Sequence, residues 1–230
     1  MSRKDRINMG DTQKRSIISM LDKNSPITEQ YRTIRTNIQF SSVEKEMRSL
    51  IFTSANASEG KSTTCTNIAA VFAQQEKSVI IIDADLRKPS IHTIFNINNT
   101  IGLTNVLTQQ QQLSEAIQMS DYHNLAILAS GLIPPNPSEL LGSNRMGELL
   151  MEAKAKYDLV IIDSPPILAV ADAQILANIT DGVVLVISSG STEIQQAKKA
   201  KELLANANAR LIGAVLNNTK QKEPNYYRDI

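Results

Sequence analysis

A doubly wound α/β fold, with a mainly parallel sheet and helices on both faces, is the class that this sequence predicts. Short all-apolar runs, such as residues 79–82 and 160–162, alternate with stretches of helical character. That alternation is typical of parallel strands buried on both faces. Three of the predicted strands are also followed by groups suited to phosphate or Mg²⁺: Lys61, then Asp83 and Asp85, then Asp163. Ligands bind at the carboxyl ends of parallel strands, so we expect these groups to meet there.

Composition fits one such domain with short extensions, since the chain has 230 residues and 42% hydrophobic content. The net charge of 24 − 23 = +1 favours no nucleic-acid partner. A single cysteine, Cys65, excludes an internal disulfide framework and fits a reducing cytoplasm, and we expect it to be a buried, inert thiol. No apolar run approaches the roughly 20 residues of a membrane span. Contact with a membrane would then go through a surface or a partner.

The N-terminal quarter divides into an arm and a helix. Residues 1–25 show no periodicity and are predicted to be a flexible arm. Its basic residues could rest on an anionic membrane surface, but we favour a solvated terminus. A helix follows Pro26, with Thr28 as the expected N-cap and apolar residues at helical spacing. On it, Glu29, Arg32 and Arg35 fall three apart and share one side. From the residues alone, we interpret them as a solvated ion-pair ladder.

The strongest motif follows a predicted strand at residues 49–53. Residues 55–62 are close to the P-loop pattern G-x-x-x-x-G-K-[ST], with Ala55 in place of the first glycine. Alanine is tolerated there if its φ is negative. The loop backbone and the start of the next helix would bind phosphate. Lys61 would neutralise its charge, and Ser62 would offer a hydroxyl to Mg²⁺. The predicted nucleotide-binding stretch is therefore Glu59, Gly60, Lys61, Ser62 and Thr63.

The remaining chain continues the alternation. We expect residues 86–99 to form a loop across the nucleotide site, with Arg87 and Lys88 near the phosphates, and we interpret His92 and His123 as structural. Residues 131–137, with three prolines, should be an extended loop. Ser143 should cap its helix. The predicted strands are 79–82, 125–128, 158–163, 182–187 and 211–216, and the predicted helices are 64–75, 103–107, 113–119, 143–156, 170–178 and 192–208.

The combined motifs resemble one family, the bacterial P-loop protein-tyrosine kinases of capsule and exopolysaccharide synthesis. The matching parts are the Walker A loop at 55–62, the A′ motif at 80–87 and the B motif at 160–166. The Glu29-x-x-Arg32-x-x-Arg35 helix and a tyrosine-bearing C-terminal stretch match as well. The resemblance extends over nearly the whole chain from about residue 26. The A′ pattern, Asp-x-Asp-x-Arg after an apolar run, is the feature that singles out this family among P-loop proteins.

The resemblance implies a role for each matching position, in a kinase domain at 26–218 with a mobile tail at 219–230. ATP and Mg²⁺ would be the cofactors. Asp83 would be the base for the incoming tyrosine, although either Asp83 or Asp85 could ligate Mg²⁺. The implied sites are Lys61, Asp83, Asp85 and Arg87 for catalysis, Ser62, Asp85 and Asp163 for the metal, Asn217 for adenine, Tyr226 and Tyr227 as acceptors, and Glu29, Arg32 and Arg35 for assembly into a ring, an octamer in the family.

The implied partners are a membrane-anchored activator, a cognate tyrosine phosphatase and polysaccharide-synthesis enzymes as substrates. The protein would lie at the inner face of the cell membrane through its activator. Two alternatives are a partitioning or division-site ATPase switch and a catalytically silent nucleotide-binding assembly subunit. The first carries a signature lysine where this chain has Asn56, and the tail tyrosines also argue against it. The sequence does not exclude the second.

Overall fold

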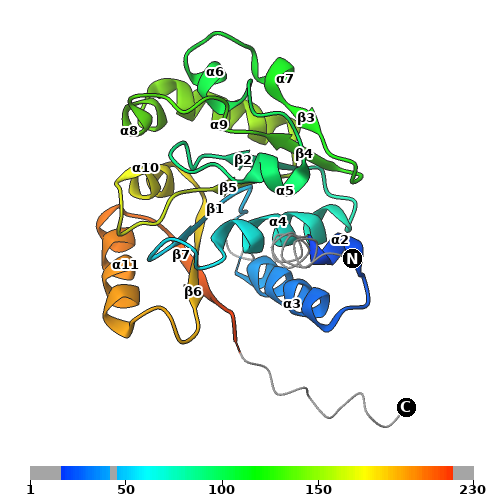
Figure 1. Cartoon of the computed structure of the whole chain (residues 1–230), viewed down its shortest axis with the longest axis vertical. Coiled ribbons are helices and arrows are strands. Elements are labelled where there is room, and N and C mark those ends of the chain that lie inside the picture. Colours follow the sequence, from blue (N-terminus) through cyan, green and yellow to red (C-terminus); the bar gives the residue numbers. More distant parts are fainter. Residues whose placement is uncertain (1–16, 42–45, 220–230) are drawn as a thin grey trace, which may run out of the picture.

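The computed structural model describes residues 17–41 and 46–219, and in them a seven-stranded sheet forms the centre of the protein (Figure 1). The strand order is β3-β4-β2-β5-β1-β6-β7, and every pairing is parallel except that of β3 with β4. This confirms the predicted fold class. The strands are β1 (Ser49–Ser54), β2 (Val79–Asp83), β3 (Gln118–Met119), β4 (Leu125–Leu128), β5 (Leu159–Asp163), β6 (Gly182–Ser188) and β7 (Leu211–Asn217).

Helices cover both faces of the sheet. Side chains alternate between the faces along each strand, so a continuous apolar strand presents apolar side chains to both. In β2, Ile80 and Ile82 pack on one side, while Val79 and Ile81 pack on the other. In Figure 1, α10 and α11 lie to the left of the sheet and α3 and α4 to its right. The helices are α2 (Ile18–Leu21), α3 (Pro26–Phe40), α4 (Lys61–Ala73), α5 (Ile91–Phe95), α6 (Leu103–Leu107), α7 (Leu113–Ala116), α8 (Pro137–Leu141), α9 (Asn144–Lys156), α10 (Asp172–Ile179) and α11 (Ile194–Asn206).

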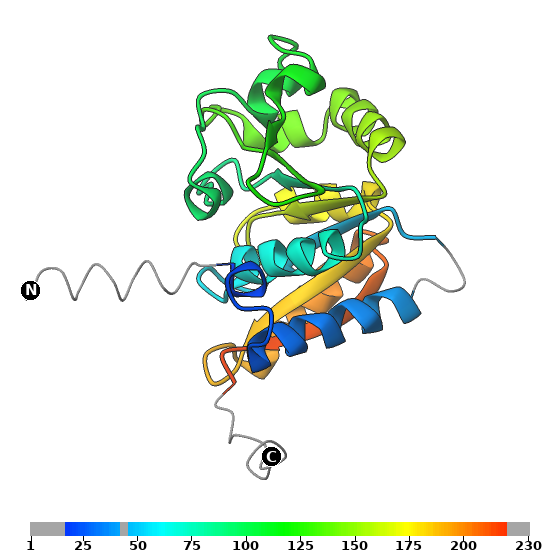
Figure 2. The ribbon, with the colours of Figure 1, turned by 90° about the vertical axis from the view of Figure 1, so that its right-hand side faces the viewer.

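The N-terminal segment differs from the prediction. An arm was expected up to residue 25, but residues 17–25 include the short helix α2, which packs on α4 (Figure 2). Ile17 and Ser19 are buried, and the Ser19 backbone N–H and hydroxyl both donate to Oδ1 of Asn67. One helical turn is too short to show a period in the sequence. The rest of the predicted arm, residues 1–16, lies outside the described residues.

Three smaller predictions are also corrected. The N-cap of α3 is Ser25, whose Oγ accepts the N–H of Ile27, with Pro26 at the first helical position. Thr28 is instead buried, and its hydroxyl donates to the carbonyl of Asp22. The predicted helix at 113–119 ends at residue 116, after which β3 follows. The predicted loop at 86–99 contains α5.

The predicted strands and long helices lie where the sequence placed them, within a few residues at their ends. The predicted cap position of Ser143 is confirmed at the start of α9, although its side chain makes no capping hydrogen bond. Cys65 is buried in α4, and burial raises the pKa of its thiol, as expected of an inert residue. In the parts of the chain that the structure describes, no helix has the length and hydropathy needed to cross a membrane.

Candidate phosphate-binding and catalytic site

The phosphate loop joins β1 to α4 and is closed by a glycine that no other residue can replace without strain. Gly60 is the N-cap of α4 and has φ +85°, in the left-handed region that favours glycine. A Cβ on Gly60 would also lie 1.9 Å from Nδ2 of Asn217. That same Nδ2 donates to the carbonyl of Glu59 at 3.0 Å. Asn217 therefore supports the loop from the end of β7. In the described part of the chain, no side chain caps the start of α4, where backbone N–H groups can bind an anion.

The Glu59 side chain holds the loop in shape from inside. Its carboxylate is buried and accepts the Ala55 N–H at 3.0 Å, the Thr192 hydroxyl at 2.7 Å and the Asn56 amide at 3.1 Å. Ala55 is not among the residues with positive φ, so the alanine fits without backbone strain. Glu59 was predicted as part of the nucleotide-binding stretch. In the structure its side chain supports the loop, and it accepts the hydroxyl of Thr192, which lies just before α11.

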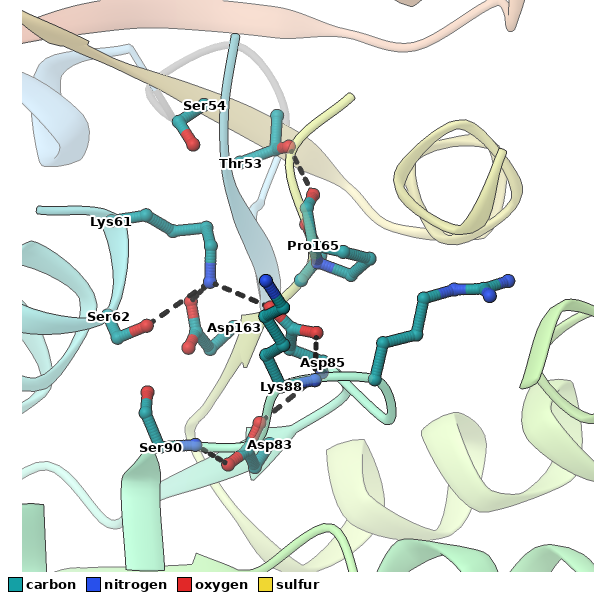
Figure 3. A network of polar contacts seen from close by, with 12 residues as sticks. Thr53, Ser54, Lys61, Ser62, Asp83, Asp85, Lys88, Ser90, Asp163 and Pro165 are labelled. Atoms are coloured by element: carbon teal, nitrogen blue, oxygen red, sulfur yellow. Dashed lines mark hydrogen bonds and ion pairs between the residues drawn. The ribbon is translucent and has the colours of Figure 1, made fainter. Parts of the chain in front are cut away.

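Lys61 brings the predicted groups together (Figure 3). Its Nζ lies 2.9 Å from Oδ1 of Asp163, 3.6 Å from Oδ2 of Asp85 and 3.1 Å from Oγ of Ser62. The lysine is buried at 8% exposure. Burial alone would lower the pKa of Lys61, but the carboxylates of Asp163 and Asp85 outweigh it and raise that pKa. The site is thus a cation held among the acidic ends of β2 and β5.

Asp83 has a different environment from Asp85. Its Oδ2 accepts the backbone N–H groups of Ser90 and Ile91, each at 3.0 Å, at the start of α5. Its Oδ1 accepts the N–H of Asp85 at 3.3 Å. Complete burial, reinforced by the nearby charge of Asp163, raises the pKa of Asp83 to about 7. A carboxylate fixed in position with a pKa near neutrality is suited to general base catalysis.

The donor set fits Mg²⁺. The Lys61 ammonium touches the same three residues that were predicted as metal ligands, Ser62, Asp85 and Asp163. In addition, Oδ2 of Asp163 is buried and has no hydrogen-bond partner, which is costly unless a ligand reaches it. No three His, Cys, Asp or Glu side chains in residues 17–41 and 46–219 form a metal cluster. Mg²⁺ is usually held by one or two carboxylates together with substrate phosphates.

Arg87 is not brought to this cluster. Its guanidinium donates to both carboxylate oxygens of Asp172, at 2.9 and 3.2 Å, and to the Ser138 hydroxyl at 3.0 Å. Asp172 is fully buried at the start of α10, and the Ser138 hydroxyl donates to it as well. The predicted position of Arg87 beside the phosphates stays a prediction, because the hydrogen bonds of its guanidinium are to Asp172 and Ser138. Asp172 was not predicted from the sequence, because no motif contains it. Its partner closest in the sequence, Ser138, is 34 residues away.

The predicted assembly residues on α3 make contacts within the chain. Glu29 and Arg32 form an ion pair on the exposed side of the helix. Arg35 instead donates to the carbonyl of Val71 at 2.8 Å, where α4 ends and its last carbonyls lack helical partners. The predicted acceptors, Tyr226 and Tyr227, lie outside the described residues.

This chain has a strand, a phosphate loop and a helix in succession, and two further strands that end in carboxylates. That combination defines the P-loop class of nucleotide-binding folds. A family described as "AAA domain" matches residues 47–211. Tyrosine-protein kinase YwqD of Bacillus subtilis is 56% identical over 225 residues, which cover 96% of this chain and 95% of YwqD. The chain belongs to the bacterial tyrosine-protein kinases.

Solved structures agree with this assignment. The crystal structure of the chimerical protein CapA2B2 superposes with a TM-score of 0.86 at 38% identity, covering 89% of this chain and 90% of that chain. The kinase domain of the Escherichia coli tyrosine kinase ETK gives a TM-score of 0.84 at 32% identity, covering 90% of this chain and 83% of that domain. The family predicted by resemblance is therefore confirmed.

Proposed function

We propose that this protein transfers the γ-phosphoryl group of ATP to protein tyrosines, and that Tyr226 and Tyr227 of another copy are among the acceptors. The observation that supports this most is the division of the acidic residues in the site. Asp85 and Asp163 face the Lys61 ammonium. Asp83 instead accepts two backbone N–H groups at the start of α5, and burial raises its pKa to about 7. Burial also raises the pKa of Asp163, but Lys61 lies against that carboxylate and opposes the effect. One set of groups suits a cation and phosphates, and the separate carboxylate suits a proton.

The proposed reaction assigns a role to each of these positions. The tyrosine oxygen forms a bond to the γ-phosphorus, the bond from that phosphorus to the bridging oxygen breaks, and ADP leaves with the electron pair. Asp83 accepts the tyrosine proton. Lys61 neutralises charge on the phosphates, and the loop backbone at the start of α4 positions them. Mg²⁺, held by Ser62, Asp85 and Asp163, would supply further charge neutralisation. Asn217 stays a proposed contact for adenine.

The wider role is proposed by analogy with the family. We propose that the kinase domain, extended to begin by residue 17, works with a membrane-anchored activator and so lies at the inner face of the membrane. Polysaccharide-synthesis enzymes would be substrates, and a tyrosine phosphatase would reverse the modification. Copies would assemble into a ring through the α3 surface of Glu29 and Arg32. Each tail phosphate adds about −1.5 to −2 charge, which would loosen the ring by repulsion.

A mixing experiment tests the proposal. The donor is a full chain with Tyr226→Phe and Tyr227→Phe, and the recipient is a full chain with Asp83→Asn, which keeps its tail but lacks the base. With labelled ATP and Mg²⁺, label should reach Tyr226 or Tyr227 of the recipient. Phosphate released to water without phosphotyrosine would point to an ATPase switch. Nucleotide binding with no turnover would point to a silent assembly subunit.

A further inference from the structure

An exposed apolar loop follows β4, on the side of Asp83 away from the phosphate loop. Leu132 and Ile133 are 65% and 63% exposed, although large aliphatic side chains are usually buried. β4 pairs with β2, and Leu128 is the register partner of Ile82, the residue before Asp83. The loop therefore leaves the sheet beside the strand end that carries the base. We call residues 131–136 the proline loop.

The proline loop is held at both of its ends. At its start, Oδ1 of Asn99 accepts the Gly131 N–H at 3.0 Å, and the Asn99 amide donates to the Gly131 carbonyl at 3.1 Å. Just beyond its end, Ser138 bonds to Arg87 and Asp172, which ties α8 to the A′ segment. Pro134 is buried within the loop. Leu132 and Ile133 are thus exposed on a fixed support, as a preorganised binding surface requires.

The order of the strands indicates what approaches this surface. Four neighbouring strands of the sheet lie in the order β4-β2-β5-β1. The phosphate loop follows β1, and Asp83 and Asp163 end the two middle strands, β2 and β5. Nucleotide phosphates belong on the β1 side. In phosphoryl transfer the attacking oxygen lies opposite the leaving oxygen. A tyrosine must therefore reach the γ-phosphate from the β2 and β4 side, where the proline loop lies.

We propose that Leu132 and Ile133 bind the tyrosine-bearing tail of another copy and set the preference for apolar residues beside the acceptor tyrosine. This inference rests on the proposed function. The tail offers two aromatic residues, Tyr226 and Tyr227, and the aliphatic Ile230 within five positions. Tyrosine is one of the residues enriched among the anchors of such surfaces.

The reach of the tail can be compared with the distance to the proline loop of the same chain. β7, from which the tail continues, is five strand steps from β4, a separation of about 24 Å. A coil of ten residues, the number from Asn217 to Tyr227, has an average reach of about 17 Å. The proline loop of the same chain is beyond that average but within the roughly 33 Å of ten extended residues. The choice of a second copy therefore rests on the proposed transfer between copies.

The test uses the full chain with Tyr226→Phe and Tyr227→Phe as the enzyme and a synthetic peptide of residues 217–230 as the acceptor. Leu132→Ser with Ile133→Ser should raise the KM for the peptide about tenfold, the effect of uncovering part of two aliphatic side chains. The kcat and the KM for ATP should not change. Leu132→Met with Ile133→Val should keep the wild-type KM. Met151→Ser, at a 67% exposed position on α9, is the matched control and should have no effect.

A peptide with Ile230→Ser adds a second arm. It should have a higher KM with the wild-type loop but no further increase with the serine variant, because both changes remove the same contact. An unchanged KM in the serine variant, or an equal increase with Met151→Ser, would contradict the proposed role of Leu132 and Ile133. It would leave the proposed function standing. No phosphate on the peptide with the wild-type loop would overturn the proposed function and this surface with it.

Discussion

The Lys61 ammonium lies 2.9 Å from Oδ1 of Asp163, and both side chains are buried where β1 and β5 end. A second carboxylate, that of Asp85, is 3.6 Å from the same nitrogen. The lysine therefore compensates acidic groups that would otherwise be buried without a counter-charge. Its position gives it a structural role in addition to the proposed contact with phosphate.

Lys61→Met should abolish phosphoryl transfer and also destabilise the fold. The rate should fall by about 10²-fold or more, because a positioned charge is lost from the site. Removing one partner of a buried ion pair costs about 3–5 kcal/mol in the free energy of unfolding. Denaturant unfolding in the absence of nucleotide and Mg²⁺ measures that cost. Lys154→Met, which breaks the more exposed pair with Asp181, should cost less. Equal losses in the two variants would contradict the proposed compensation.

Asp83 should give transfer a pH dependence. A base acts when ionised, and the pKa of Asp83 in the free protein is about 7. The kcat/KM for transfer should therefore rise with pH through about 7, and Asp83→Asn should slow transfer and remove this limb. Rates measured from pH 5.5 to 8.5 test this. A limb that persists in Asp83→Asn would assign the titration to another group.

As the pH rises, the free energy of unfolding should fall while the rate of transfer rises. The pKa of Asp83 is raised from 3.8 to about 7 on folding, so the folded protein binds its proton more tightly than the unfolded chain. The stabilisation from the protonated carboxyl is complete below about pH 4 and is lost as the pH rises through about 7. Compared with Asp83→Asn, the wild type should lose free energy of unfolding over this range. Parallel pH dependences in the two proteins would mean that Asp83 does not titrate there.

The other two carboxylates should respond to Mg²⁺. Asp85→Asn and Asp163→Asn should weaken Mg²⁺-dependent nucleotide binding, because a neutral amide is a poorer ligand for this ion. Asp83→Asn should leave that binding largely intact. Calorimetric titration of nucleotide with and without Mg²⁺ separates the roles. If Asp83→Asn abolishes the Mg²⁺ effect and Asp85→Asn does not, the roles of Asp83 and Asp85 are exchanged.

The α3 residues should separate assembly from stability. Glu29→Ala with Arg32→Ala should shift sedimentation toward monomers with little change in unfolding, since an exposed ion pair contributes about 0–1 kcal/mol. Arg35→Ala should destabilise the chain itself by about 1–3 kcal/mol, because the Val71 carbonyl loses a charged donor. An unchanged oligomer in the double variant would return this pair to a solvated ion-pair ladder.

Much of the fold could be predicted because the strands are continuous apolar runs with motif residues at their ends. The runs around Ile81 and Ile161 needed no tertiary information to be recognised as buried. The grouping of Lys61, Asp85 and Asp163 followed from the rule that parallel strands present their carboxyl ends at one edge. Ser62 belongs to the same group, because it follows Lys61 directly in the sequence.

The remaining features depend on contacts between distant residues. Arg87 belongs to a motif, but its partner Asp172 is set by the packing of α10, which no local pattern encodes. The capping contact of Arg35 requires the end of α4 to lie beside α3. The strand order likewise depends on how the helices connect across both faces. In each case the sequence identifies the chemical group, and its partner is fixed only by the tertiary structure.

The central place of β1 has a consequence for how the chain folds. β1 is complete by residue 54, but its two neighbours are β5 and β6, with Ser49 opposite Val160 and Leu50 opposite Gly182. During synthesis, both edges of this strand stay unpaired while more than a hundred further residues are made. Unpaired apolar strands of this kind fold slowly and aggregate readily. Shortened chains that end before β5 should accumulate as insoluble protein, and the ability to bind nucleotide should emerge only late in synthesis.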